Sequence, residues 1–381
     1  MASSNPLLGT VLVTGGCGFL GYHLVGSLLA DPEIGPVHVL DLDTTRNTHP
    51  DAHYTRGSVT DSPAVLLSFL ERIQPRVIFH AASPSATYAS SSSFYGTNVR
   101  GTENLLHQAN KLSYIQALVY TSSIDIYANP PHQNISEHQP LLPDHPPFWA
   151  GVTEYDRTKT MAHRLVLAAN DPVRLKTAAI VSAHIWGVRD SQSTSFYFDS
   201  FSDPSTALVQ IGPGGNRVST VEVGNCAAAH ILAAKALVDP SRIKPANSKE
   251  YDPRVDGEAF NVTDGVEVDF WNHYRDVCRL IRQAESNDAL KTRVVPVWVF
   301  RLVVLCIRWA LLVFTLGLVE PPTSLTRTAL SWCVEDHLLD DGKAQVVLGY
   351  RPREMDRQKL LVESVEWERE RRRQLAEKKG Q

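Results

Sequence analysis

The stretch TVLVTGGCGFLG at residues 10–21 decides the fold of this 381-residue chain. Its first five residues form a short apolar run rich in β-branched side chains, which is typical of a strand buried in a parallel sheet. Three glycines spaced three apart follow, and apolar residues then recur at helical spacing as far as Leu29. The order of strand, glycine turn and helix predicts the turn that begins a dinucleotide-binding fold.

The three glycines of this turn have different roles. Gly15 allows the chain to turn, Gly18 allows the backbone to approach a pyrophosphate, and Gly21 allows the helix to pack closely on the strand. Phe19 and Leu20 begin the helix, whose free N–H groups and positive dipole then point at the phosphates. We therefore expect these five residues to contact the cofactor.

A carboxylate follows at the distance that a dinucleotide site requires. The apolar run VHVL at 37–40 predicts the second strand, and Asp41 ends it, about 20 residues after the third glycine. A carboxylate at this place accepts hydrogen bonds from the adenosine ribose hydroxyls and repels a 2′-phosphate, which favours NAD. Arg46 leaves NADP open, because a nearby arginine tolerates that phosphate. The alternative is that Asp41 only caps a turn.

Further strand patterns recur at the intervals of an α/β fold. The apolar runs at 76–80, 117–120 and 177–182 are separated by helical patterns, including residues 101–112. Strands that alternate with helices predict a doubly wound parallel sheet of the Rossmann type, with ligands beyond the carboxyl ends of its strands. Five residues with small or polar side chains fall at such ends: Gly15, Asp41, Ala82, Ser123 and Ser182.

Three residues form a candidate acid–base site. Tyr155 and Lys159 stand four apart, so on a helix they share one face, and Ser123 precedes them at the end of a predicted strand. A nearby ammonium favours the phenolate, so we expect Lys159 to lower the pKa of Tyr155. The Ser123 hydroxyl would hold a substrate oxygen against the phenol, which suits proton transfer with an alcohol or carbonyl. The spacing alone is weak evidence, because such pairs are common on solvated helices.

Composition narrows the class of protein. Hydrophobic residues make up 43% of the chain and charged residues 20%, as in globular proteins with a large core. The net charge of −4 argues against a nucleic-acid binder. The five cysteines lack metal-binding spacing, which indicates reduced thiols and no metal site. The N-terminus lacks the pattern of a signal peptide, so we expect a cytosol-facing protein.

The order of the motifs resembles the extended short-chain dehydrogenase/reductase family. The matching strings are TGGCGFLG, FHAASP, NVRGTENLL, VYTSSIDIY and YDRTK, with Asp41 between the first two. VYTSS, LVLAAND and GNCAAAHILAAKAL further resemble the 3β-hydroxysteroid dehydrogenase branch, and within it the decarboxylating sterol-4α-carboxylate 3-dehydrogenase group. The resemblance covers about residues 8–355.

The resemblance implies roles for individual residues. By position, Ser123 would orient the substrate oxygen, Tyr155 would be the general acid/base, and Lys159 would bind the nicotinamide ribose. Asn98 in NVRGT would support the site, although a helix N-cap is an equally good interpretation. Further cofactor contacts are expected at Ser58, Val59, Ala81, Ala82 and Ser182.

Two departures from the family pattern concern the cofactor site. The family usually has an acid after the second strand, where it touches the adenine, and Ser58 replaces it in the string RGSV. The family also usually has an Arg-Pro pair after a later strand, and VSAH at 181–184 takes its place. We therefore expect an altered adenine contact and an altered nicotinamide wall, with His184 packed rather than catalytic.

The chain divides into a dinucleotide-binding domain at 8–185, a substrate cap at 186–355 and a charged C-terminal helix or tail at 356–381. In the cap the regular alternation decays, and aromatic stretches such as FYFDSF at 196–201 suit a large apolar substrate. A plain packed core explains the same residues as well. The charged tail is interpreted as a solvated helix without a chemical role.

An apolar stretch at 294–319 stands out within the cap. It contains Arg301 and Arg308, seven apart on one helical stripe, and its longest uncharged run is 309–319. That run is shorter than the roughly 20 residues that span a bilayer. We therefore expect an interfacial helix in one leaflet, with its arginines at the headgroups. The resemblance to sterol enzymes implies that this membrane is the endoplasmic reticulum membrane, with the protein on its cytosolic side. The alternative is a buried helix of the cap.

The resemblance implies NAD(P)-dependent oxidation of the 3β-hydroxyl of a sterol or related polycyclic terpenoid, with or without loss of a 4-carboxylate. One alternative is a non-decarboxylating 3β-hydroxysteroid or terpenoid dehydrogenase of a specialised pathway. A nucleotide-sugar epimerase or flavonoid-type reductase shares the fold, but the apolar stretch argues against soluble sugars. A non-catalytic dinucleotide sensor would not need the serine–tyrosine–lysine set. The sequence does not define the oligomeric state, and a homodimer stays open.

Overall fold

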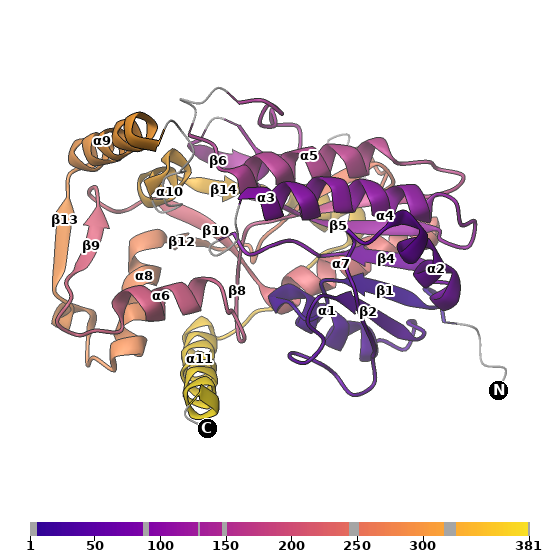
Figure 1. Cartoon of the computed structure of the whole chain (residues 1–381), viewed down its shortest axis with the longest axis horizontal. Coiled ribbons are helices and arrows are strands. Elements are labelled where there is room, and N and C mark those ends of the chain that lie inside the picture. Colours follow the sequence, from indigo (N-terminus) through magenta and orange to yellow (C-terminus); the bar gives the residue numbers. More distant parts are fainter. Residues whose placement is uncertain are drawn as a thin grey trace.

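The computed structural model describes residues 6–86, 91–128, 130–146, 151–243, 251–315 and 325–379 (Figure 1). Its larger part is a seven-stranded sheet in which every neighbouring pair of strands is parallel. In spatial order the strands are β11 (Glu258–Val262), β7 (Lys176–Ser182), β5 (Ala117–Ser123), β4 (Val77–His80), β1 (Val11–Thr14), β2 (Val37–Asp41) and β3 (His53–Arg56). The predicted α/β fold with a parallel sheet is confirmed.

Helices cover both faces of this sheet (Figure 1). α1 (Phe19–Leu29) and α7 (Val223–Val238) pack together on one face, and α2 (Pro63–Ile73), α4 (Thr102–Ala109) and α5 (Glu154–Ala168) cover the other. Strands β1 and β4 are buried at every residue, because both of their faces are covered. The strand order reverses between β1 and β4, which is where a ligand-binding crevice opens in such sheets.

The smaller part is a cap built on short strands. The first group contains β12 (Glu267–Asp269), β10 (Arg217–Glu222), β14 (His337–Leu339) and β6 (His132–Ile135), with β8 (His184–Trp186) paired to β10. A separate parallel pair joins β9 (Leu208–Ile211) and β13 (Thr292–Val295). The main helices of the cap are α6 (Ser193–Phe201), α8 (Phe270–Arg282), α9 (Val297–Thr315) and α10 (Arg327–Val334).

The two parts of the molecule exchange elements along the chain. Helix α7 and strand β11 come from the region expected to form the cap, yet they complete the large sheet and its helix layer. Strand β6 comes from the first half of the chain but joins the cap sheet, where His132 is in register with His337. A boundary at residue 185 therefore separates the cap from the dinucleotide-binding part only incompletely.

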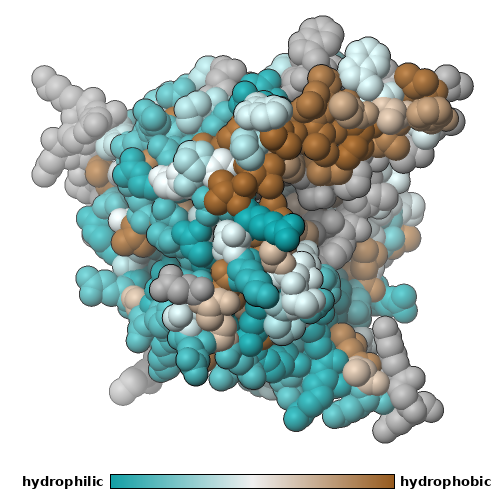
Figure 2. Space-filling view, turned by 90° about the vertical axis from the view of Figure 1, so that its left-hand side faces the viewer, coloured by the Kyte–Doolittle hydropathy of each residue, from teal (hydrophilic) through white to brown (hydrophobic). Residues whose placement is uncertain are grey.

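Helix α9 lies along the outer edge of the cap, and its apolar surface is exposed. It is long and apolar enough to cross a membrane, and no residue of its apolar window is buried. The exposed large side chains form an apolar patch (Figure 2): Trp298, Leu302, Val303, Leu305, Trp309, Val313 and Phe314. The alternative of a buried cap helix is therefore wrong. Residues 316–319 of the predicted stretch lie outside the described residues.

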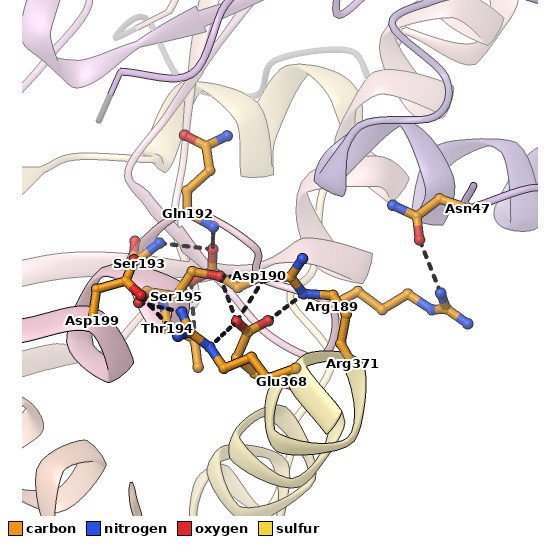
Figure 3. A network of polar contacts seen from close by, with 11 residues as sticks. Asn47, Arg189, Asp190, Gln192, Ser193, Thr194, Ser195, Asp199, Glu368 and Arg371 are labelled. Atoms are coloured by element: carbon orange, nitrogen blue, oxygen red, sulfur yellow. Dashed lines mark hydrogen bonds and ion pairs between the residues drawn. The ribbon is translucent and has the colours of Figure 1, made fainter. Parts of the chain in front are cut away.

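The C-terminal helix α11 (Arg357–Lys379) is docked on the cap, which corrects the expected solvated helix. Leu361 and Val365 are buried in a cluster with residues of α6 and α8. Glu368 is fully buried and accepts hydrogen bonds from Ser195 and from two arginines of its own helix (Figure 3). The many charges of this segment hid its buried stripe, and its longest exposed run is 373–378.

Candidate active site

The glycine turn between β1 and α1 has no room for side chains at two of its glycines. Gly15 has a φ of +74°, and a Cβ there would lie 2.7 Å from the Cα of Ala82. A Cβ at Gly21 would overlap the carbonyl oxygen of Gly15. These two glycines therefore fix the turn and the close approach of α1 to the strand.

Gly18 has a different environment, because it faces open space. It is exposed within a largely buried turn, and a Cβ there would meet only the Gly15 carbonyl oxygen, at 3.2 Å. It is also the N-cap of α1, so the N–H groups of Phe19 and Leu20 lie in the helix turn that leaves such groups unpaired. The side chains of Phe19 and Leu20 are buried. Open space at a positive helix end fits the pyrophosphate of a dinucleotide.

Asp41 ends β2 and faces the glycine turn. Its Oδ2 accepts a 2.9 Å hydrogen bond from the N–H of Cys17, and its Oδ1 accepts one of 3.2 Å from the N–H of Asp43. Arg46, the residue that left NADP open, forms a 3.1 Å ion pair with Asp43. Two carboxylates beside an arginine that is already paired disfavour a 2′-phosphate.

Other expected cofactor residues lie at the same sheet edge. The N–H of Ala81 donates to the Thr14 carbonyl oxygen at 3.1 Å, which ties the end of β4 to the end of β1. Ala82 follows and packs on the glycine turn. Val59 is buried, and its carbonyl oxygen accepts a 3.0 Å hydrogen bond from the Asn104 side chain. The structure thus brings these residues to the end of the strands where Gly18 lies exposed.

Ser58, which replaces the usual acid, keeps a carboxylate close by. Its N–H donates a 2.8 Å hydrogen bond to Oδ2 of Asp61, and its hydroxyl lies 2.7 Å from that of Thr60. The negative charge missing at Ser58 is therefore supplied three residues later, in the same turn.

Ser123 ends β5, in register with Ser182 of the neighbouring strand β7. The Ser182 hydroxyl donates to the Ser122 carbonyl oxygen at 3.2 Å, so it braces this edge of the sheet. The Ser123 hydroxyl donates a 2.9 Å hydrogen bond to Oδ2 of Asp125. The Ser123 side chain also lowers the pKa of the Tyr155 phenol, against the larger effect of burial, so the predicted serine and the predicted tyrosine lie close together.

Helix α5 positions Tyr155 and Lys159 from its first turn. The N–H of Asp156 donates to Thr153 Oγ1 at 3.2 Å, and the N–H of Thr153 donates to Asp156 Oδ2 at 3.0 Å, which forms a capping box. One turn further on, Lys159 is buried, and its Nζ donates to the Thr121 carbonyl oxygen at 2.5 Å. The same Nζ lies 4.5 Å from the ring centroid of Tyr120.

Burial governs the protonation of this pair and corrects one prediction. Burial raises the pKa of Tyr155 above its ordinary value, and the negative charge of Asp125 raises it further. Burial lowers the pKa of Lys159 to about 7, although Asp125 opposes this shift. The expected lowering of the Tyr155 pKa by Lys159 is therefore wrong for this structure, because burial and the Asp125 charge raise this pKa by more than the Ser123 side chain lowers it.

Asn98 supports the site from inside a helical stretch rather than by capping a helix. It is buried in the π-helical segment Tyr95–Gly101, and its Nδ2 donates to Thr158 Oγ1 at 3.0 Å. The N-cap interpretation is wrong, because Phe94 before the segment is already helical. The Oδ1 of Asn98 has no hydrogen-bond partner among the described residues, which is rare for a buried amide oxygen. This oxygen is available to a water or ligand at the site.

Two residues at the site were not expected from the sequence. Asp125 accepts the hydrogen bond from Ser123 on one oxygen, and its other oxygen accepts a 3.1 Å hydrogen bond from Nε1 of Trp332. Trp332 belongs to α10 of the cap, 207 residues further along the chain. The only indication in the sequence is an acidic residue two positions after Ser123. The sequence does not reveal that the cap contacts Ser123 through the Asp125 carboxylate.

These parts define a class of protein. A glycine turn at a helix N-terminus, a carboxylate at the end of β2 and a serine–tyrosine–lysine set lie at one edge of a parallel sheet. The first two suit a dinucleotide, and the third can move a proton on and off an alcohol oxygen. The fold and site are those of a dinucleotide-dependent oxidoreductase.

The comparisons with known sequences give the family. The sequence profile of the 3-beta hydroxysteroid dehydrogenase/isomerase family matches residues 12–291, and the chain belongs to this family. The chain is 31% identical over 305 residues to the protein named "Sterol-4-alpha-carboxylate 3-dehydrogenase ERG26, decarboxylating" of Gibberella zeae, which covers 78% of this chain and 92% of that relative. The family expected from the motifs is therefore confirmed.

A second relative comes from a bacterium. The chain is 30% identical over 364 residues to the "3 beta-hydroxysteroid dehydrogenase/Delta 5-->4-isomerase" of Mycobacterium tuberculosis, which covers 92% of this chain and 88% of the relative. Both relatives are dehydrogenases by name, and this chain is likewise an oxidoreductase of the family.

Solved structures agree on the fold. The UDP-glucose 4-epimerase of Thermotoga maritima superimposes with a TM-score of 0.66 at 19% identity, covering 95% of this chain and 99% of that one. The dTDP-glucose 4,6-dehydratase DesIV of Streptomyces venezuelae, solved with NAD bound, gives 0.66 at 22% identity, with coverage of 95% and 97%. At these identities the similarity concerns the fold and not the substrate.

Proposed function

We propose that this protein oxidises the 3β-hydroxyl of a sterol or related polycyclic terpenoid with NAD as cofactor. The observation that carries the proposal is the placement of Ser123, Tyr155 and Lys159 together at the sheet edge where the glycine turn opens. Membership of the family supports a 3-hydroxyl as the reacting group. The Asp43–Arg46 ion pair supports NAD over NADP.

The residues of the site divide the reaction between them. Bound NAD supplies the hydride acceptor. Ser123 holds the substrate hydroxyl, and Tyr155 in its phenolate form takes the hydroxyl proton. Lys159 has its Nζ at the end of β5, where it binds the nicotinamide ribose. The first turn of α1, at Gly18, binds the pyrophosphate.

Oxidation of a substrate with a carboxylate on the neighbouring carbon gives a β-keto acid. Such an acid loses carbon dioxide readily, because the new ketone accepts the electrons of the breaking bond. Decarboxylation therefore needs no additional catalytic group of the protein. The Gibberella zeae relative, named as decarboxylating, supports this outcome for the chain, and the Mycobacterium tuberculosis relative supports oxidation without it.

The direct test is turnover by the purified full-length protein. It is assayed with NAD or NADP and a panel of 3β-hydroxysterols with and without a 4-carboxylate, following reduced cofactor and carbon dioxide separately. We expect reduced NAD with both kinds of sterol and carbon dioxide with the carboxylated kind only. Tyr155→Phe should still bind NAD but lose about 10²–10⁴-fold in turnover. If no polycyclic alcohol is oxidised, the proposal fails.

We also propose that α9 attaches the protein to the cytosolic face of the endoplasmic reticulum membrane. The helix presents exposed Trp298, Leu302 and Phe314 to solvent, which is an unusual amount of apolar surface for one helix. Helix α9 follows directly on β13, which is paired with β9. A groove lies between α9 and α10 and is lined by residues of these two helices. A helix held along the cap in this way supports insertion into one leaflet rather than passage across the bilayer.

Polar substitutions on the outer face of α9 test this attachment. The triple variant Trp298→Ser, Leu302→Ser and Phe314→Ser should move from the membrane fraction to the soluble fraction, because it removes three apolar anchors. Val173→Ser is the matched control, since this valine is 92% exposed but lies outside the cap. Deleting 296–318 should release the protein as well. A triple variant that stays in the membrane fraction would exclude attachment through this face.

A further inference from the structure

A groove of about 710 Å³ lies between α9 and α10. Arg301, Arg308 and Trp309 line it from α9, and Arg327 and Leu330 line it from α10. A volume of this size is typical of sites for single organic molecules. The groove lies on the cap, and Ser123, Tyr155 and Lys159 are not among the residues that line it.

The charges in the groove favour an anion. Three guanidinium groups line it, from Arg301, Arg308 and Arg327, against one carboxylate, Glu335. The carboxylate is engaged by the Ser331 hydroxyl, which donates to its Oε2 at 2.5 Å. Within the described part of the chain, Arg301 and Arg327 make no hydrogen bond or ion pair. Two guanidiniums thus remain available for a ligand.

The same groove has apolar walls. Leu305 and Trp309 of α9 are more than half exposed, although both are large apolar side chains, and Leu330 faces them from α10. Apolar surface next to guanidiniums matches a ligand with a rigid apolar body and one acidic group. A guanidinium binds a carboxylate through two parallel hydrogen bonds, which fixes the orientation of such a ligand.

Helix α10 separates the groove from the catalytic residues. Thr328 Oγ1 donates a 2.9 Å hydrogen bond to Oδ2 of Asp156, the residue after Tyr155. A Cβ at Gly151, four residues before Tyr155, would lie 2.5 Å from the Cβ of Arg327. The groove and the catalytic site are therefore neighbours across one helix, which is about 10 Å wide.

We propose that this groove is a loading site, which binds the carboxylate of a polycyclic amphipathic acid before the acid enters the catalytic cleft. The identity of the acid as substrate rests on the proposed function. Its apolar body would lie against Leu305 and Trp309, and its carboxylate would bind Arg301 and Arg327. The apolar outer face of α9 adjoins the groove, so an acid dissolved in a membrane would reach it without crossing bulk water.

Binding is tested without turnover. The purified full-length protein in neutral detergent is titrated with a steroid carboxylic acid and, as its uncharged counterpart, with the methyl ester of the same acid. Trp309 lines the groove, so its fluorescence reports occupancy, and Trp309→Phe identifies its share of the signal. We expect the acid to bind about tenfold more tightly than the ester. Arg301→Gln and Arg327→Gln should each remove most of that difference and leave ester binding unchanged.

A matched control and a kinetic measurement accompany the titration. Arg293→Gln removes an exposed arginine of β13 outside the groove and should bind the acid as the wild type does. With a carboxylated 3β-hydroxysterol, Arg327→Gln should raise KM about tenfold with kcat unchanged. With the same sterol lacking the carboxylate, both constants should stay at the wild-type values.

Three outcomes would overturn the loading site. The acid could bind no more tightly than its ester, or the two arginine variants could bind it as the wild type does. The Trp309 signal could instead respond only to phosphatidylglycerol in phosphatidylcholine vesicles, which would make the groove a phospholipid site. Failure of the proposed function gives a different pattern, namely acid binding without oxidation of any sterol.

Discussion

The Ser123 hydroxyl donates a 2.9 Å hydrogen bond to the Asp125 carboxylate. The second oxygen of Asp125 accepts from Trp332 of the cap, so the carboxylate is held from both sides. The direction of the Ser123 hydroxyl is thus fixed, and its oxygen accepts a 3.3 Å hydrogen bond from the N–H of Asp125. Asp125 acts through Ser123, which makes it a positioning residue.

Asp125→Asn should therefore change both the rate and its pH dependence. The carboxylate charge raises the pKa of Tyr155 in addition to burial, and it raises the pKa of Lys159 against burial. Without that charge both pKa values fall, so the active phenolate forms at lower pH. We expect the acid limb of the pH profile of kcat/KM to move to lower pH, while kcat falls about tenfold because Ser123 is less well oriented. Steady-state kinetics between pH 6 and about 10 measure both effects.

Asp252→Asn is the control for the change of charge. Asp252 is exposed and forms an ion pair with Arg254. Within the described part of the chain it makes no hydrogen bond to Ser123, Tyr155 or Lys159, so the pH profile of kcat/KM should match that of the wild type. A merely structural role of Asp125 would lower kcat and leave the acid limb in place. Trp332→Phe keeps the Asp125 carboxylate but removes the indole N–H that donates to it. This variant should lower kcat without moving the acid limb of the pH profile to lower pH.

The phenol of Tyr155 should remain protonated at high pH in the absence of NAD. Burial, with a contribution from Asp125, raises its pKa above the ordinary value of about 10. The ultraviolet phenolate absorbance of the wild type minus that of Tyr155→Phe isolates this one group. We expect no Tyr155 phenolate below about pH 10 in the free protein. A phenolate that appears near pH 7 would instead support activation by the Lys159 charge alone.

The parts of the site that follow one another closely in the chain were predictable from the sequence. The glycine spacing at 15, 18 and 21, Asp41 at the end of β2 and the four-residue spacing of Tyr155 and Lys159 each depend on local geometry. Parallel strands then bring their carboxyl ends to one edge, which places Ser123 beside this pair. Local pattern and sheet topology together were therefore sufficient to predict that Ser123, Tyr155 and Lys159 lie at one sheet edge.

Burial and long-range contacts were not predictable in the same way. The approach of Trp332 to Asp125 depends on how the cap folds over the sheet, and no spacing encodes it. The raised pKa of Tyr155 has the same origin, because the sequence shows the nearby lysine but not the loss of water around the phenol. The buried stripe of α11 was hidden by the charges around it, since a carboxylate such as Glu368 is normally exposed.

Asp41→Asn should weaken the preference for NAD over NADP. The carboxylate holds the glycine turn through the N–H of Cys17, and it repels a 2′-phosphate. We expect the ratio of kcat/KM for NAD to that for NADP to fall at least about tenfold, mainly through a higher KM for NAD. Asp51→Asn, an exposed acid of the following loop, should leave the ratio unchanged. An unchanged ratio in Asp41→Asn would mean that Asp41 only caps the turn.

The buried carboxylate of Glu368 should contribute more to stability than any exposed charge of the same helix. It is fully buried, and it accepts from Ser195 at 2.8 Å, from Arg371 at 2.6 Å and from Arg372 at 2.7 Å (Figure 3). Glu368→Gln keeps the shape but leaves Arg371 without its anion and leaves Arg372 with Asp199 alone. We expect a loss of about 2–3 kcal/mol, less than for a fully buried pair, because about a third of each arginine side chain is exposed.

Glu370→Gln is the matched control on the same helix. Its carboxylate is exposed and pairs with Arg373, so its removal should leave the unfolding midpoint close to that of the wild type. Thermal unfolding in neutral detergent compares the two variants with the wild type. If the midpoint of Glu368→Gln falls no further than that of Glu370→Gln, the C-terminal helix does not depend on this buried carboxylate. If the midpoint falls in Glu368→Gln and not in Glu370→Gln, the contact of α11 with α6 depends on the Glu368 carboxylate.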